Sequence, residues 1–372
     1  MYHRSPFRLI LAFVVASVSC AALAQEHAVT ERGTQAGAAW RVDIPAHWNH
    51  ELIVFYHGYS TTPITFPANE ALSPMFDPLL KRGYALIQSG YSATGWAIEQ
   101  AQAETEALRR QFVRNHGAPK RTYVIGMSMG GALTAFTIEK SPDVYAGALS
   151  LCGAIEPSSH FLQHNFAIRA AFDYYFPSVL GSLVPVPSDY RLDDDRNEAK
   201  IAAALASNPQ ALRALLSLYG AADAKSLAPI LAFITQDTRE LQERTRGNPF
   251  DNADYIYVGS GDDAALNDGV KRYRADPKAT AYLTRWYTPS GKLLRPMLAL
   301  HDTGDPLVPA SGAFEYALAA QRAGHADNFV QQYVNREGHC VFTPDEIARA
   351  FDELVDWVGS NKRPLSGKLP AR

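Results

Sequence analysis

The chain has 372 residues, of which 47% are hydrophobic and 20% are charged, and its formal net charge is −3 at pH 7. This balance is typical of a globular protein and excludes extended disorder and collagen-like structure. The length suits one large α/β core that carries an insertion, and the mild negative charge argues against nucleic acid or an anionic membrane surface as a partner.

The N-terminus, residues 1–24, has the three-part layout of a secretory signal peptide. A basic start with Arg4 and Arg8 precedes the apolar run 9–18, and Ala22-Leu23-Ala24 offers a cleavage site. The alternative, a membrane anchor, would need about 20 apolar residues, and no segment of the chain comes close. We therefore expect cleavage after Ala24 and a mature protein without a membrane span that is secreted or periplasmic.

Residues 25–155 contain the first part of the predicted core, in which strands alternate with helices. The run ELIVFY at 51–56 is apolar after its first residue, Glu51, which is typical of a strand in a parallel sheet that is covered on both faces. The alternation predicts an α/β fold with a mostly parallel central sheet flanked by helices. The expected strands are 38–45, 51–56, 84–88, 122–126 and 146–151, and the expected helices are 95–115 and 130–140.

The alternation stops at residues 156–288, where helix-favouring runs at 198–206 and 209–219 stand among prolines. We interpret this segment as a mainly helical cap that is inserted into the core. The prolines expected to interrupt its helices are Pro185, Pro187, Pro229 and Pro249. The second part of the core, residues 289–372, resumes with strands at 296–300 and 329–334 and helices at 310–323 and 344–358.

Gly126-Met127-Ser128-Met129-Gly130 matches the G-x-S-x-G nucleophile elbow, in which glycines allow a sharp turn that projects the serine above the sheet. The motif alone also occurs by chance. Here it stands between an apolar strand and a helix, which is the context that it requires. We therefore predict that Ser128 is a nucleophile.

A serine hydroxyl is a poor nucleophile at neutral pH, so Ser128 needs a base, and the base needs an acid that holds its tautomer. Asp305 and His339 follow Ser128 in the order expected for this type of site. Both residues lie just after the carboxyl ends of predicted strands, which is where α/β sheets have their binding and catalytic sites. Asp305 is the first choice for the acid, and Asp302, interpreted as a loop-closing residue, is the alternative.

The charge that develops on the substrate oxygen needs hydrogen-bond donors. The backbone N–H of Met129 comes with the elbow, and we expect the backbone N–H of Tyr59, after His57-Gly58, to be the second donor of this oxyanion hole. The alternative for residues 57–59 is an ordinary turn that ends a strand.

The elbow, the turn at Tyr59, the Asp305 segment and Gly338-His339 together resemble the α/β-hydrolase superfamily over residues 38–155 and 290–360. The resemblance implies an α/β-hydrolase fold and a hydrolase that uses no metal and no cofactor. It extends to secreted bacterial members, serine esterases among them, whose substrates are poorly defined.

Hydrolysis of carboxylic esters is the leading interpretation, with a small-molecule or polymeric ester as the substrate. Phe172, Tyr175 and Phe176 in the predicted cap are candidates for an apolar substrate pocket, although the same rings could pack the helices of the cap. A secreted serine peptidase, of the aminopeptidase or prolyl-oligopeptidase type, would use the same triad. A non-catalytic binding protein could share the scaffold.

Two cysteines, Cys152 and Cys340, would remain after removal of the signal peptide, and cysteines of exported proteins are commonly paired. Cys152 ends a predicted strand and Cys340 follows His339, so both should lie along the carboxyl edge of the sheet. We predict a disulfide between them, and two buried free thiols are the alternative. The chain has no H-E-x-x-H or other tight cluster that would indicate a metal site.

Overall fold

The computed structural model describes residues 28–370, so the predicted signal peptide at 1–24 lies outside the described residues. Within the described part, no helix has the length and apolar character that crossing a membrane requires.

The described chain forms one nine-stranded sheet with the order β1-β2-β4-β3-β5-β6-β7-β8-β9. The pairs β1–β2 and β2–β4 are antiparallel, and every pair from β4–β3 onward is parallel. The mostly parallel sheet predicted from the alternating pattern is therefore present. The strands are β1 (Val29–Gln35), β2 (Ala38–Ile44), β3 (Glu51–Tyr56), β4 (Ala85–Ser89), β5 (Arg121–Met127), β6 (Gly147–Leu151), β7 (Met297–Gly304), β8 (Phe329–Glu337) and β9 (Gly367–Lys368).

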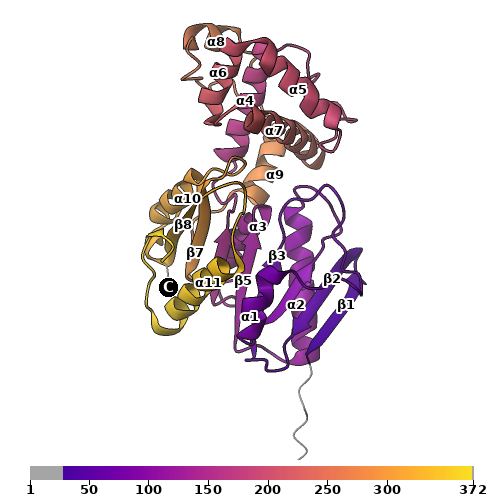
Figure 1. Cartoon of the computed structure of the whole chain (residues 1–372), viewed down its shortest axis with the longest axis vertical. Coiled ribbons are helices and arrows are strands. Elements are labelled where there is room, and N and C mark those ends of the chain that lie inside the picture. The colour runs from indigo at the N-terminus through magenta and orange to yellow at the C-terminus, as the bar shows by residue number, and fades with distance from the viewer. Residues whose placement is uncertain (1–27, 371–372) are drawn as a thin grey trace, which may run out of the picture.

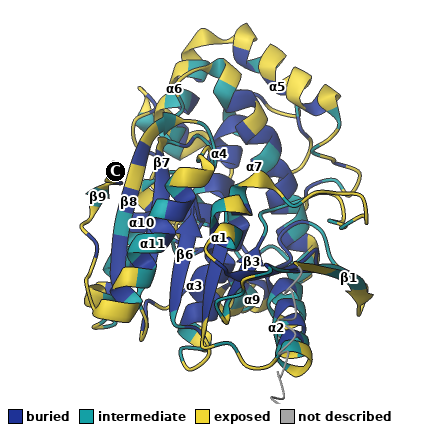
Figure 2. Cartoon of the chain, turned by 60° about the horizontal axis from the view of Figure 1, so that its bottom comes forward, coloured by how far each residue is buried: buried dark blue, intermediate teal, exposed yellow. Residues whose placement is uncertain are grey.

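Helices cover both faces of this sheet (Figures 1 and 2). Leu52, Val54 and Tyr56 of β3 belong to an apolar cluster that includes side chains of α2, α3 and α10, whereas Ile53 and Phe55 belong to the cluster on the opposite face, which includes side chains of α1 and α11. Burial on both faces explains why β3 is apolar from Leu52 onward rather than alternating. These helices are α1 (Asp77–Lys81), α2 (Ile98–His116), α3 (Met129–Lys140), α10 (Ser311–Arg322) and α11 (Pro344–Ser360).

Between β6 and β7 the chain forms a helical segment whose helices α4 to α8 gather at one end of the molecule, with α9 leading back to the sheet (Figure 1). Its buried side chains join the same apolar cluster as α2 and α3. The boundaries of a separate cap at residues 156 and 288 stay a prediction. The helices are α4 (Phe161–Tyr175), α5 (Asp195–Ser207), α6 (Pro209–Tyr219), α7 (Ala224–Thr245), α8 (Asp263–Gly269) and α9 (Pro277–Tyr287).

Two features of the structure differ from the sequence expectations. Pro229 lies inside α7 and does not interrupt it. Its ring leaves the carbonyl of Lys225 without the usual helical donor, but Lys225 is exposed in the first turn of the helix, where water can satisfy that carbonyl. Strand β1 was not expected, because it is an edge strand whose side chains are mostly exposed and therefore show no apolar alternation.

Helix α11 begins at Pro344, four residues after Cys340, with a capping box. The box holds the segment that follows the predicted base, His339. The Thr343 hydroxyl accepts from the backbone N–H of Glu346, and the Glu346 carboxylate accepts from the backbone N–H of Thr343 at 2.8 Å. The same carboxylate pairs with Arg336 on β8.

We expect Thr343→Ala to lower the free energy of unfolding by about 1 kcal/mol, because the substitution removes one half of this capping box. Urea unfolding measures the change. Ser360→Ala, at the exposed end of the same helix, is the control and should change stability by less than about 0.5 kcal/mol. Equal stabilities of the two variants would contradict the role of the cap.

Candidate active site

Ser128 stands at the sharp turn between β5 and α3, with φ 57° and ψ −121°. Such a backbone conformation costs a non-glycine residue about 1–3 kcal/mol and persists only where the surroundings impose it. A Cβ on Gly126 would lie 2.0 Å from the Gly130 carbonyl oxygen, and a Cβ on Gly130 would lie 2.1 Å from the Tyr56 carbonyl oxygen. Only glycine therefore allows the strand and the helix to approach closely enough for this turn.

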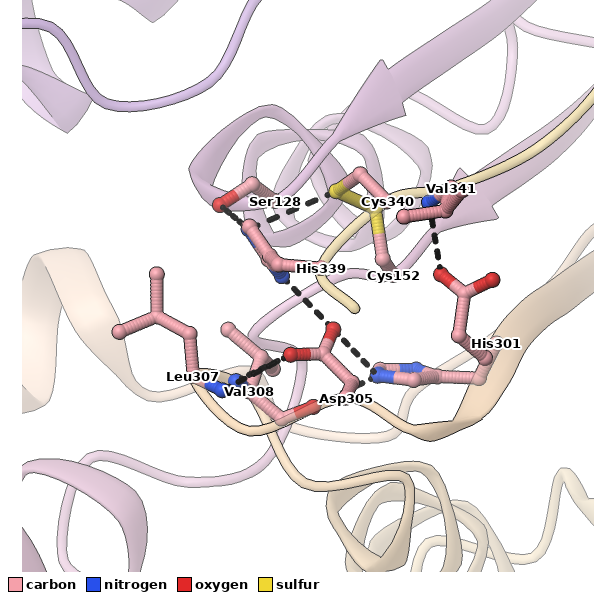
Figure 3. Close-up of a disulfide and its surroundings, with 10 residues drawn as sticks. Ser128, Cys152, His301, Asp305, Leu307, Val308, His339, Cys340 and Val341 are labelled. Atoms are coloured by element: carbon pink, nitrogen blue, oxygen red, sulfur yellow. Dashed lines mark hydrogen bonds and ion pairs between the residues drawn. A yellow bond between two sulfur atoms is a disulfide. The ribbon is translucent and has the colours of Figure 1, made fainter. Parts of the chain in front are cut away.

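His339 and Asp305 lie beside Ser128, as the sequence predicted (Figure 3). The Ser128 hydroxyl donates to His339 Nε2 at 2.9 Å, and His339 Nδ1–H donates to Asp305 Oδ2 at 2.7 Å. Asp305 directly follows β7, and His339 follows β8, so parallel strands bring the three residues to one edge of the sheet. The arrangement places a base within reach of the hydroxyl proton and an acid behind the base.

Asp305 is held as an anion by its surroundings. Its Oδ1 accepts from the backbone N–H groups of Leu307 and Val308, each at 2.9 Å, and His301 Nε2 lies 3.5 Å from its Oδ2. Burial alone would raise the pKa of Asp305, but the bonds from His301 and His339 outweigh it and lower the pKa to about 2. The carboxylate is therefore charged at neutral pH and can stabilise a positive imidazole on His339.

Two backbone N–H groups are available near Ser128. Met129 is the first residue of α3, so its N–H has no acceptor within the helix. The turn that carries Tyr59 approaches the serine closely, because a Cβ on Gly58 would lie 3.2 Å from Ser128 Cβ and 3.7 Å from its Oγ. The assignment of the Met129 and Tyr59 N–H groups to an oxyanion hole stays a prediction.

No family model matches the chain. The chain is 21% identical over 399 residues to an o-phthalyl amidase from Xanthobacter agilis. The alignment covers 88% of this chain and 86% of that protein. An acylaminoacyl peptidase from Pyrococcus horikoshii superposes with a TM-score of 0.49 at 11% identity, covering 90% of this chain and 42% of the peptidase, so the chain spans about two fifths of the peptidase's length. An esterase from Pyrococcus furiosus superposes with a TM-score of 0.46 at 13% identity, covering 95% and 97% of the two chains.

The fold is decided by features of the chain itself. A strained strand-to-helix turn carries Ser128, and the acid and the histidine follow it in the order Ser, Asp, His at the carboxyl ends of later parallel strands. The chain has an α/β-hydrolase fold. The expectation drawn from the sequence is thereby confirmed for the fold, while the activity needs a separate argument.

Asp302, the alternative to Asp305 as the predicted acid, has different surroundings from Asp305. Its side chain is fully buried, and its Oδ2 accepts from the backbone N–H of Val341 at 3.0 Å. Burial raises the pKa of Asp302, and the hydrogen bond from Val341 opposes this shift. Asp302 therefore fastens the loop that follows His339 instead of contacting the imidazole.

We expect Asp305→Asn to reduce kcat by about 10⁴-fold, because an amide cannot hold the His339 tautomer or stabilise its charged form. Asp302→Asn should cost far less, since an amide oxygen can still accept from the Val341 N–H. Steady-state kinetics of the two variants on one ester substrate give the ranking. The reverse ranking would move the acid assignment to Asp302.

Cys152 and Cys340 are joined by a disulfide, with their Cα atoms 5.3 Å apart and 188 residues of sequence separation (Figure 3). The bridge connects the end of β6 with the residue that follows His339. It places Cys340 Sγ 3.5 Å from His339 Nε2. Among the described residues, Cys152, His339 and Cys340 form the one group whose ligand atoms lie close enough for a metal, and the disulfide engages both sulfurs.

We expect the double variant Cys152→Ser/Cys340→Ser to lose up to about 5 kcal/mol of stability, because the bridge closes a very long loop in the unfolded chain. Hydrolytic activity should also fall, since the His339 loop loses a tether. Urea unfolding and initial rates measure the two effects. Recovery of both cysteines as free thiols, in non-reducing peptide maps of protein made in an oxidising compartment, would contradict the bridge.

The three predicted pocket residues lie in the helical segment. Phe172 is fully buried, its ring lies 5.3 Å from that of Phe176, and the Arg169 guanidinium stands over it at 5.8 Å. Tyr175 packs against Tyr174 at 4.9 Å. These contacts account for the three rings as packing residues of the segment, which was the alternative interpretation, and a role in substrate binding stays a prediction.

Sequence reasoning missed two polar residues, Tyr219 and Glu156. The Tyr219 hydroxyl, at the end of α6, donates to the Pro306 carbonyl at 3.0 Å, directly beside Asp305. Glu156 follows β6, and burial together with the charge of Glu315 raises its pKa to about 7. Neither residue belongs to a motif, and Tyr219 reaches the Asp305 loop through a tertiary contact that sequence spacing does not reveal.

Glu156 also borders a small cavity of about 10 Å³ beside α3, which has room for about one water molecule. The cavity is mostly apolar and aromatic. Its lining includes Trp96, Phe136, Phe161, Leu162 and Tyr287.

Proposed function

We propose that the protein is a secreted serine hydrolase that cleaves carboxylic esters through an acyl-enzyme intermediate. The observation that carries the proposal is the continuous chain of two hydrogen bonds from the Ser128 hydroxyl through His339 to the Asp305 carboxylate. In this arrangement the hydroxyl proton has an acceptor, and the imidazole has a fixed tautomer and a counter-charge.

In the first half of the reaction, Ser128 Oγ attacks the acyl carbon while its proton moves to His339 Nε2. The carbonyl double bond becomes a single bond to an oxyanion, which the Met129 and Tyr59 N–H groups stabilise. The intermediate then collapses, the bond to the leaving oxygen breaks, and His339 returns its proton to that oxygen. The alcohol departs and the acyl group remains on Ser128.

In the second half, a water molecule gives a proton to His339 Nε2 and attacks the acyl carbon. The second oxyanion collapses with cleavage of the bond to Ser128 Oγ, which takes the proton back from His339. A carboxylic acid leaves, and the site returns to its starting state. Asp305 keeps its charge throughout and stabilises the imidazolium in both halves.

Amide cleavage is the second candidate, and the amidase from Xanthobacter agilis, 21% identical over most of its length, favours it. The same triad serves both reactions, because only the leaving atom that His339 protonates differs. A secreted serine peptidase is one form of this second candidate, because a peptide bond is an amide bond. Specificity constants for an ester and an amide of the same acyl group would separate the two.

The disulfide supports the proposed secreted or periplasmic location, because such bridges persist in oxidising compartments. A non-catalytic binding protein on the same scaffold is the remaining alternative. An assembled triad with a strained serine argues against it, because nothing in a binding role alone requires this geometry.

We expect Ser128→Ala to fold normally and to lose hydrolysis by several orders of magnitude, since no other hydroxyl occupies the elbow. A fluorophosphonate probe should label the wild-type protein at Ser128 and should not label the variant. Ser141→Ala, at the far end of α3, is a control that should keep both activity and labelling. Near-normal turnover by folded Ser128→Ala would contradict the proposal.

A further inference from the structure

The turn that carries the predicted oxyanion donor Tyr59 is held by contacts to the loop at residues 91–97. The His57 ring stacks on Tyr91 with ring centroids 3.9 Å apart, and the Tyr91 hydroxyl donates to the His57 carbonyl at 3.3 Å. The backbone N–H of Gly95 donates to the Ser60 carbonyl at 2.7 Å. Both ends of the turn are therefore fastened to a neighbouring core loop.

The side chain of Tyr59 makes a further contact, with the helical segment between β6 and β7. Its hydroxyl donates to Glu240 Oε1 on helix α7 at 2.7 Å, across 181 residues of sequence. Burial and the charge of Glu240 raise the pKa of Tyr59, so the hydroxyl keeps its proton and remains a donor at neutral pH. The Tyr59 ring also packs edge-on against Phe233 of α7 at 5.2 Å.

Glu240 binds both loops at once. Its Oε2 accepts from the backbone N–H of Trp96 at 3.3 Å, while Gln236, one turn earlier on α7, donates to Oε1 at 2.9 Å. A Cβ on Gly95, which has φ +70°, would lie only 2.0 Å from Glu240 Oε2. The carboxylate thus fills a space that only glycine leaves open, and its position relative to the two loops is tightly defined.

We propose that Glu240 is a positioning residue for the oxyanion hole, which acts through the Tyr59 hydroxyl to hold the Tyr59 backbone N–H at the distance that the transition state requires. The inference rests on the proposed serine-hydrolase function. Oxyanion donors stabilise charge that exists only in the transition state, so a displaced donor lowers kcat more than it weakens substrate binding. The helical segment between β6 and β7 therefore contributes to catalysis through this carboxylate.

The test compares Glu240→Ala, Tyr59→Phe and the double variant on 4-nitrophenyl butyrate. Each single variant should lower kcat about tenfold with KM changed less than about twofold, because the donor is displaced and not removed. The inhibition constant of a trifluoromethyl ketone, whose adduct with Ser128 bears an oxyanion, should rise by the same factor. The double variant should be no worse than Glu240→Ala alone, since that substitution already breaks the hydrogen bond between Tyr59 and Glu240 that Tyr59→Phe removes.

Two further variants separate positioning from general stability. Glu240→Gln keeps an acceptor for the Tyr59 hydroxyl and should recover most of kcat. Glu243→Ala is the matched control, because Glu243 lies on the same helix and pairs with Arg239 at its exposed side. Glu243→Ala should leave kcat and the inhibition constant unchanged, and thermal unfolding of all variants verifies that they fold.

Unchanged kcat and ketone affinity in Glu240→Ala, additive losses in the double variant, or a lower melting temperature without a kinetic effect would each overturn the inference. Labelling of the wild-type protein by a fluorophosphonate at Ser128, together with ester turnover, tests the proposed function independently. If the wild-type protein is labelled and active while the Glu240 variants behave normally, only the positioning role fails. If the wild-type protein shows neither reaction, the proposed function and the positioning role fall together.

Discussion

The candidate site depends on the backbone conformation of Ser128. A residue with φ 57° between a strand and a helix is unfavourable in isolation, and it is stabilised here by the packing of α3. Residues 129–138 of that helix are all buried, so the apolar surface that they remove from water outweighs the local strain. The close approach that Gly126 and Gly130 permit also brings the Gly58 turn against the serine. The same close approach therefore places the predicted nucleophile, Ser128, beside the turn that carries the predicted oxyanion donor.

The carboxyl edge of the sheet supplies the three triad residues, and contacts from elsewhere hold the loops that carry them. Tyr219 on α6 binds the loop of Asp305, Asp302 and the disulfide fasten the loop of His339, and Glu240 on α7 binds the turn of Tyr59. Each loop is therefore secured by a bond that joins segments far apart in the sequence. A site assembled from separate loops needs such supports, because a strand end alone does not fix the side chain that follows it.

The sequence predicted those features that depend on local pattern. Strand β3 and helix α6 have the expected bounds, because the apolar run from Leu52 to Tyr56 and the proline at the helix start, Pro209, are local signals. The elbow motif and the order of Ser, Asp and His identified the residues that the structure brings together. Glu240 escaped detection because its partner Tyr59 is 181 residues away. The rings of Phe172 and Phe176 were candidates for a pocket, since composition cannot distinguish a lining residue from a packing residue.

The disulfide encloses all of the inserted helices, α4 to α9, and the Asp305 loop between its two cysteines. In the connection between α7 and α8, Ile256 and Val258 are 75% and 70% exposed, and such exposed segments are preferred sites of proteolytic cleavage. A cut there would leave Ser128 and Cys152 on one fragment, and Asp305, His339 and Cys340 on the other. Because the bridge joins the fragments and β6 of one pairs with β7 of the other, a nicked molecule would remain covalently joined and would separate only when it is both reduced and unfolded.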